Sequence, residues 1–138
     1  MKCHFFQKPN SRMAYPMKNA NHGLCLIINN EIFEKYEPRI GSSEDVKRLQ
    51  QLFGELGFSV ITKKNLTIKE MEKVLNNFVK KDEHKKSEMC VVIVMSHGKE
   101  GCFETTDGNL VSKTKYLLLI FFSPVYQINT FMKNMFSV

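Results

Sequence analysis

Two stretches of the chain are apolar throughout and end abruptly in polar or turn-forming residues. Residues 23–28 read Gly-Leu-Cys-Leu-Ile-Ile and precede Asn29-Asn30, and residues 91–95 read Val-Val-Ile-Val-Met and precede Ser96-His97-Gly98. Unbroken aliphatic runs of this length predict strands, and the lack of polar alternation favours strands covered on both faces, as in a parallel sheet between helices. Residues 58–62 predict a third, shorter strand.

Two further stretches repeat apolar residues at intervals of three and four, which predicts amphipathic helices. Ser42-Ser-Glu-Asp45 has the spacing of a capping box, so we expect a helix from about residue 43 to 56, followed by Gly57 as its left-handed C-terminal cap. The apolar face of this helix comprises Val46, Leu49, Leu52, Phe53 and Leu56. Thr67-Ile-Lys-Glu70 is a second capping box, and the helix it opens has an apolar face made of Met71, Val74, Leu75 and Phe78.

Strand, helix, strand, helix and strand therefore follow one another. Right-handed crossovers turn this order into a mostly parallel sheet with helices on both faces, so the expected fold class is α/β. Residues 31–40 predict a loop, and residues 102–105 and 110–112 predict a hairpin around Asp107-Gly108. We expect a disordered lead-in over 1–14, one layered domain over 15–112 and a divergent tail over 113–138.

The composition is that of one globular domain. The chain has 138 residues, of which 43% are hydrophobic and 25% charged, enough to bury a core. The net charge of +6 leaves two interpretations: a solvated surface, or a remote alternative in which an unrelated basic α/β domain binds nucleic acid. The lysines are spread in pairs such as Lys63-Lys64 and Lys80-Lys81 without a basic helical face. This favours the first interpretation, so we expect no nucleic-acid partner.

The four cysteines follow neither a metal-binding nor a disulfide pattern. Cys25 and Cys90 lie within predicted apolar strands, and the other two cysteines are Cys3 and Cys102. None of the four belongs to a Cys-x-x-Cys pair. We therefore expect reduced structural thiols, no metal, no cofactor and a cytoplasmic protein. The longest apolar run, residues 116–122, is far shorter than the roughly 20 residues that cross a bilayer, and the N-terminus lacks the apolar segment of a secretory signal. We expect no membrane partner.

Three residues could carry chemistry. His97 follows the strand predicted over 91–95, at the carboxyl end where open α/β sheets bind ligands, although a lone histidine there is more often structural. Gly98 lacks a side chain, so its backbone N–H could approach a substrate carbonyl as an oxyanion donor. Arg39, between Pro38 and Gly41, is by itself a surface arginine; a functional arginine there would offer two parallel hydrogen bonds to a carboxylate.

Five separated pieces of the chain form a larger pattern: Tyr15-x-Met17, Gly23-x-Cys-Leu-Ile-Ile-Asn-Asn30, Arg39-x-Gly-Ser-x-x-Asp45, Leu49-x-x-x-Phe-x-x-Leu-Gly-Phe58 and Met95-Ser-His-Gly98. In this order and spacing they resemble the large subunit of the caspases, cysteine endopeptidases that cut proteins after aspartate. The resemblance spans Tyr15 to about Ser112 and includes Asp107-Gly108. It implies the caspase layered fold, proteolysis in apoptosis with an inflammatory role left open, and a second caspase chain as homo- or heterodimer partner.

The resemblance also implies a role for each candidate residue. His97 corresponds to the catalytic histidine, Gly98 to an oxyanion-hole donor, and Arg39 to the arginine that grips the substrate aspartate. In the family mechanism a cysteine thiolate attacks the peptide carbonyl while the histidine transfers protons.

The chain departs from the family at the nucleophile. By the resemblance this cysteine lies in Gln-Ala-Cys-x-Gly, about 50 residues after the histidine, and residues 98–138 contain no such motif, no second pocket arginine and no small subunit. Cys102, in the predicted hairpin, is a poor substitute. Two interpretations of a caspase-family chain stay open. One is a C-terminally truncated, catalytically incomplete endopeptidase, and the other is a non-catalytic regulator that binds a full caspase.

Overall fold

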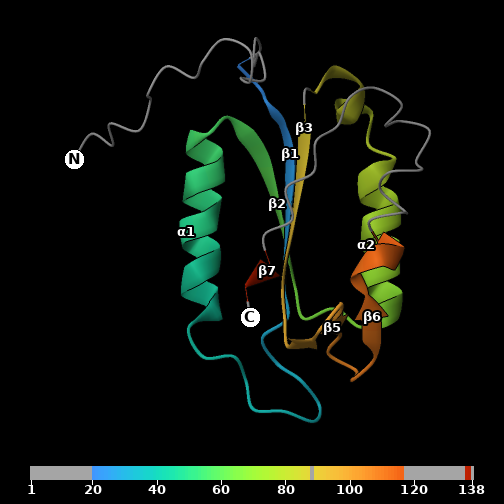
Figure 1. Cartoon of the computed structure of the whole chain (residues 1–138). Helices are drawn as coiled ribbons and strands as arrows, with labels where there is room; N and C mark the ends of the chain where they lie inside the picture. Colours follow the sequence, from blue (N-terminus) through green and yellow to red (C-terminus); the bar gives the residue numbers. More distant parts are fainter. Residues whose placement is uncertain (1–19, 88, 117–135, 138) are drawn as a thin grey trace.

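A parallel sheet forms the centre of the structure (Figure 1). The computed structural model describes residues 20–87, 89–116 and 136–137. β1 (Gly23–Asn29) lies between β2 (Phe58–Lys64) and β3 (Met89–Met95), and all three run parallel. β7 (Phe136–Ser137) pairs with the end of β3, which gives the order β2-β1-β3-β7. The three strands predicted from apolar runs are confirmed, each with one or two additional residues.

Helices cover both faces of this sheet. Figure 1 shows α1 (Ser42–Glu55) on one side and α2 (Ile68–Val79) on the other, which confirms the predicted α/β fold class. The 3₁₀ helix η1 (Asp82–Lys86) connects α2 to β3. A small antiparallel sheet follows β3 and consists of β4 (Gly98–Lys99), β5 (Cys102–Glu104) and β6 (Leu110–Ser112). β5 and β6 are the predicted hairpin, whereas β4 has no counterpart in the sequence-based prediction.

Parts of both ends of the chain lie outside the described residues. The lead-in predicted over 1–14 lies outside the described residues, as do residues 117–135 of the predicted tail. Residues 113–116 form a helical turn directly after β6. The division of the chain at residues 15 and 112 therefore stays a prediction. Within the described part of the chain, every helix is too short or too polar to cross a membrane.

Alternate residues of the central strands enter two separate cores. The core on the α2 side contains Leu24, Leu26, Ile28, Met71, Leu75, Phe78, Cys90, Val92 and Phe103. The core on the α1 side contains Cys25, Ile27, Val46, Phe58, Val91, Ile93 and Met95. Successive residues of a strand point to opposite faces. Because both faces of β1 and β3 are covered, these strands are apolar at every position.

The N-terminus of α2 forms as its sequence predicts. Thr67 Oγ1 accepts a hydrogen bond from Glu70 N, and the Glu70 carboxylate accepts one from Thr67 N at 2.9 Å. These contacts form the capping box, and the hydrogen bonds from Thr67 lower the pKa of Glu70. The hairpin turn adds Asp107, whose carboxylate lies 3.3 Å from Ile68 N. A negative charge is favourable at this end of a helix.

The capping box predicted at Ser42 is wrong. α1 begins at Ser42 itself, and its N-cap is Gly41, which has φ 88° and provides no side-chain cap. The Ser42 hydroxyl instead accepts a hydrogen bond from Asn29 Nδ2 at 3.1 Å, at the end of β1. The chain turns into α1 through a left-handed residue, a conformation that glycine adopts without the strain of a Cβ. The Ser42 hydroxyl therefore binds the end of β1 and does not cap α1.

The predicted apolar face of α1 is only partly confirmed. Val46 is buried, and Leu49 and Phe53 pack against the α1-side core. By contrast, Leu52 is 48% exposed and Leu56 is 43% exposed. Among the described strands α1 contacts chiefly β1 and β2, so only a narrow stripe of the helix reaches the sheet. Gly57 follows the helix with φ 82°, as predicted for its C-terminal cap.

The two helices should respond differently to the loss of a leucine. We expect Leu75→Ala in α2 to lower the free energy of unfolding by about 2–5 kcal/mol, because Leu75 is fully buried and its loss leaves a cavity. Leu52→Ala in α1 is the matched control and should change it by about 0.5 kcal/mol or less. Urea unfolding followed by circular dichroism measures both. Equal losses would show that Leu52 belongs to the core.

His84 of η1 is buried against α2. Its Nε2 lies 2.7 Å from Phe78 O, and its ring meets the Phe78 ring edge-on with centroids 4.8 Å apart. Burial lowers the pKa of His84; the Phe78 carbonyl and Glu83 oppose this shift, and Lys81 adds to it. The folded chain therefore favours the neutral imidazole.

This burial should make the protein less stable in mild acid. Above about pH 6.5, the ordinary histidine pKa, the imidazole of His84 is neutral in both the folded and the unfolded chain. The contribution of the buried His84 to the free energy of unfolding is then fully present. As the pH falls toward the lower pKa of the folded state, the unfolded chain takes up a proton first and stability is lost. Urea unfolding at about pH 7.5, 6.5 and 5.5 should show this loss, and His84→Gln should reduce it. An unchanged pH dependence in His84→Gln would exclude His84 as the cause.

Candidate functional site

The candidate residues emerge at the carboxyl end of the central sheet. Asn29 of β1 is paired in register with Met95 of β3, and Asn30 N donates to Met95 O at 2.8 Å. Loop 31–40 leaves the end of β1, and Ser96-His97-Gly98 leaves the end of β3. The two strand ends therefore place the segments that carry Arg39 and His97 at one edge of the sheet, where ligands bind in open α/β folds.

Asn30 joins several segments at this edge. Its side chain is fully buried; Oδ1 accepts from Leu66 N at 3.0 Å, and Nδ2 lies 3.3 Å from Glu104 O and 3.4 Å from Ser96 Oγ. Ser96 Oγ itself donates to Glu104 O. The backbone oxygen of Asn30 accepts from Arg39 Nη1 at 3.3 Å. One side chain thus connects β1 to the β2–α2 connection, to the end of β3 and to the hairpin.

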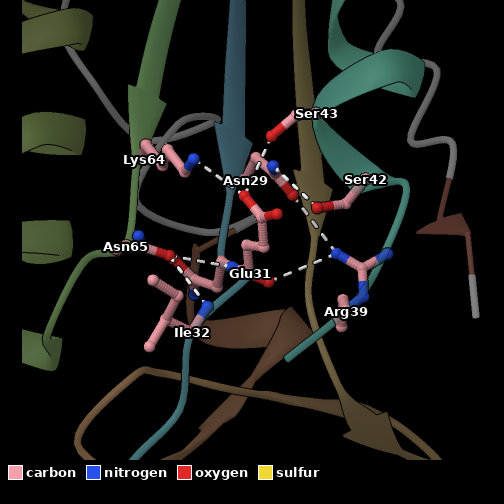
Figure 2. A network of polar contacts seen from close by, with 9 residues as sticks. Asn29, Glu31, Ile32, Arg39, Ser42, Ser43, Lys64 and Asn65 are labelled. Carbon is pink, nitrogen blue, oxygen red and sulfur yellow. Dashed lines mark hydrogen bonds and ion pairs between the residues drawn. The ribbon is translucent and has the colours of Figure 1, made fainter. Parts of the chain in front are cut away.

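Arg39 is half-buried against the end of β1, as Figure 2 shows. Its Nη1 donates to Asn29 Oδ1 and to Asn30 O, both at 3.3 Å, and both acceptors are neutral. No described carboxylate forms an ion pair with Arg39. Burial lowers the pKa of Arg39, against the opposing effect of Asp45 and Glu31. A guanidinium has five N–H donors, and no described residue accepts a hydrogen bond from those on Nη2 and Nε.

Glu31 is close to Arg39 but is held by other groups. Its carboxylate lies 2.8 Å from Lys64 Nζ and accepts from Ser43 Oγ at 2.9 Å, and these contacts lower its pKa (Figure 2). Asn65 Oδ1 accepts from Glu31 N at 2.9 Å and from the next backbone N–H at 3.0 Å. Arg39 N donates to Glu31 O at 2.9 Å and closes the loop. The network fixes the loop, and Glu31 acts on Arg39 through space without forming an ion pair with it.

His97 packs against the same loop. Its ring centroid lies 4.6 Å from that of Phe33 and 5.5 Å from that of Tyr36. Its Nε2 lies 3.5 Å from the carbonyl oxygen of Glu37, two residues before Arg39. Because a carbonyl oxygen only accepts, this contact favours the tautomer with the proton on Nε2 and leaves Nδ1 to accept one. Loop 31–40 therefore contacts the candidate histidine and contains the candidate arginine.

Gly98 is exposed at the start of β4. A Cβ on this residue would lie 2.6 Å from Cys102 O and 3.2 Å from the Cα of Phe103, its register partner in β5. Packing of the hairpin against β4 thus requires a glycine here. Its role as an oxyanion donor stays a prediction, because a close backbone approach already accounts for the residue.

The sequence reasoning missed the residues that hold this site together. The pattern marks Asn29 and Asn30 only as turn formers, whereas both are buried and hydrogen-bonded to several segments. Phe33 and Tyr36 lie in a loop without hydrophobic periodicity. The sequence signal that could have indicated these two residues is a pair of aromatic side chains in a mostly polar loop that also contains Arg39.

Cys25 and Cys90 are poor candidates for a nucleophile, because both are buried. Burial raises the pKa of Cys25 to about 12, and Cys90 adds to this shift. A thiol with such a pKa stays protonated at neutral pH. Cys25 and Cys90 enter opposite cores, which is incompatible with a disulfide between them. Across the described ranges, no group of three or more His, Cys, Asp or Glu side chains could hold a metal ion.

The sequence of this chain is similar to a known protein family. The sequence model of the caspase domain matches residues 22–136. The chain belongs to the caspase family. Caspase-1 of Mus musculus is 39% identical over 108 residues, which are 76% of this chain and 27% of the relative. Caspase-2 of Gallus gallus is 34% identical over 109 residues, 77% of this chain and 26% of the relative.

A third caspase has a similar identity and a similar coverage. Caspase-3 of Mesocricetus auratus is 37% identical over 98 residues, which are 69% of this chain and 35% of that relative. The chain thus spans about a quarter to a third of the length of these relatives. The caspase resemblance inferred from five sequence pieces is confirmed.

A substitution at Gly98 tests how closely β4 packs on β5. We expect Gly98→Ala to lower the free energy of unfolding by about 1–3 kcal/mol, because its Cβ would overlap the backbone of β5. Gly54→Ala is the matched control, because a Cβ at this position in α1 meets nothing within 4 Å and alanine favours a helix. Thermal unfolding measures both variants. Equal or higher stability of Gly98→Ala would contradict the close packing of β4 on β5.

Proposed function

We propose that this chain carries the histidine, the oxyanion donor and the aspartate-binding arginine of a cysteine endopeptidase that cuts proteins after aspartate. We further propose that the 138 residues do not cleave peptides by themselves. The observation that carries the proposal is the half-buried guanidinium of Arg39, which is held by neutral acceptors at the same sheet edge as His97. The substrate would be a protein with aspartate before the cut bond.

Each residue has a chemical role in this proposal. The carboxylate of the substrate aspartate binds the N–H donors of Arg39 that no described residue uses, and a planar guanidinium can form two parallel bonds with it. His97 Nδ1 takes the proton of an attacking thiol and returns it to the leaving amine. The N–H of Gly98 donates to the oxygen that becomes negative when sulfur bonds to the carbonyl carbon.

The absence of cleavage by this chain follows from its thiols. The sequence contains no Gln-Ala-Cys-x-Gly, and Cys25 and Cys90 are buried in the central strands. Cys102 lies in β5, the strand whose backbone packs on Gly98. Without a thiolate beside the histidine, no acyl-enzyme can form. By family character we also propose a role in apoptotic proteolysis, a cytoplasmic location and a second caspase chain as partner.

The aspartate preference can be tested on the chain itself. We expect a short acetylated peptide with an internal aspartate to bind more tightly than the same peptide with asparagine, because only the former carries a charge for Arg39. Arg39→Gln should abolish this preference and Arg39→Lys should reduce it about tenfold, since lysine lacks the planar fork. Arg48→Gln, on the exposed side of α1, is the control with the same charge change. Titrations followed by NMR chemical shifts measure the affinities.

The second half of the proposal is tested by turnover. Purified chain incubated with aspartyl peptides should give no cleavage. Cleavage that requires a reduced thiol and disappears in His97→Ala would show that the chain holds a working nucleophile. An equal affinity of wild-type chain for the aspartate and asparagine peptides would instead exclude the proposed arginine subsite.

A further inference from the structure

Asn29 is the residue through which the end of β1 contacts Arg39. Its side chain is only 2% exposed and is hydrogen-bonded at both ends. Nδ2 donates to Ser42 Oγ at 3.1 Å, and Oδ1 accepts from Arg39 Nη1 at 3.3 Å (Figure 2). A guanidinium has only donors, so the carboxamide must turn its oxygen toward Arg39 and its nitrogen toward Ser42. The first residue of α1 and Arg39 are thereby held by one buried side chain.

The chemistry of this contact determines the charge of the site. A carboxamide oxygen orients the guanidinium but does not neutralise it. Glu31, which could do so, is held by Lys64 and Ser43. Asp45 is exposed on α1 and acts on Arg39 only through space, since it forms no ion pair among the described residues. The neutrality of residue 29 therefore leaves the positive charge of Arg39 for an incoming anion.

We propose that Asn29 is a positioning residue that keeps Arg39 oriented but unpaired, so that the guanidinium binds the carboxylate of an acidic peptide. This inference rests on the proposed function of Arg39 and adds the reason why the arginine is available. Asn29 does not touch the peptide. It acts only through the position and charge state of Arg39.

The substitution Asn29→Asp tests the idea with almost no change of shape. The carboxylate accepts from Arg39 Nη1 as the amide oxygen does, and the Ser42 hydroxyl can donate to its second oxygen where it previously accepted. The fold should therefore keep its melting temperature or gain stability. Arg39 now has an internal counter-ion, so affinity for the aspartate peptide should fall about tenfold to a hundredfold.

Two further variants separate charge from packing. Asn76→Asp on the exposed side of α2 makes the same charge change away from Arg39 and should keep the peptide affinity within about threefold. Asn29→Ala removes the anchor without adding charge, so it should lower the melting temperature and broaden or shift the NMR signal of Arg39 Nε–Hε. A purely structural role for Asn29 would instead lower the melting temperature in Asn29→Asp as well.

The experiment is an NMR titration of each chain with the aspartate and asparagine peptides, observed at Arg39 Nε–Hε. Loss of the aspartate preference in Asn29→Asp at unchanged melting temperature supports the inference. Full retention of the preference in Asn29→Asp overturns the inference but leaves the proposed function intact.

If the wild-type chain shows no aspartate preference, the proposed function fails, and the ligand-free spectra decide the role of Asn29. A shifted Arg39 signal in Asn29→Asp then supports a positioning contact, and an unchanged signal overturns it. Should Asn29→Asp not fold, the same comparison is made with Asn29→Ala.

Discussion

The buried carboxamide of Asn30 is the contact on which this sheet edge depends. It satisfies the N–H of Leu66 and the carbonyl of Glu104, and it reaches the hydroxyl of Ser96. If the carboxamide were lost, the N–H of Leu66 would stay buried without its partner, at a cost of about 1–3 kcal/mol. The Ser96 hydroxyl and the Glu104 carbonyl would keep the hydrogen bond between them. An apolar residue of the same size cannot replace it. The β2–α2 connection, the end of β3 and the hairpin are thus joined at this edge because one side chain bonds to all three.

The site built on this edge differs from an ordinary structural ion pair. Lys64 and Glu31 pair with each other and join β2 to the loop. Arg39, close by, has only neutral acceptors even though it is half-buried. Burying a charge without a counter-ion reduces stability, so a bound carboxylate, as proposed above, would offset part of this cost. The feature that supports the proposed role of Arg39 is therefore the distribution of its partners, which residue type alone does not reveal.

The parts of the fold that depend on local sequence could be predicted, and the parts that depend on contacts across the fold could not. The strands follow from runs of apolar residues, and the α2 capping box is formed within four consecutive residues. Ser42 offered an equally good local signal, but its hydroxyl bonds to Asn29, which lies in β1. Leu52 has helical periodicity, yet α1 meets the sheet along too narrow a stripe to bury it.

The same distinction applies to the site. The end of a strand is a place where His97 could be expected from sequence, because strand ends carry ligand sites in α/β folds. The ring contacts of His97 with Phe33 and Tyr36 join residues from different strand connections, so no sequence spacing encodes them. Glu37 contacts His97 through its backbone oxygen, and a backbone contact leaves no requirement on the residue type. Such positions cannot be identified from one sequence.

Loop 31–40 links the two chemical tasks of the site. Its aromatic side chains pack on His97, and Arg39 lies near its end, tied to Glu31 through the backbone. A displacement of this loop would move His97 and Arg39, the residues proposed for proton transfer and carboxylate binding, together. Asn65 restrains the start of the loop by accepting from two of its backbone N–H groups, and Asn29 and Asn30 hold the guanidinium near its end. Three asparagines, none of which needs to touch a substrate, therefore contribute to the geometry between His97 and Arg39.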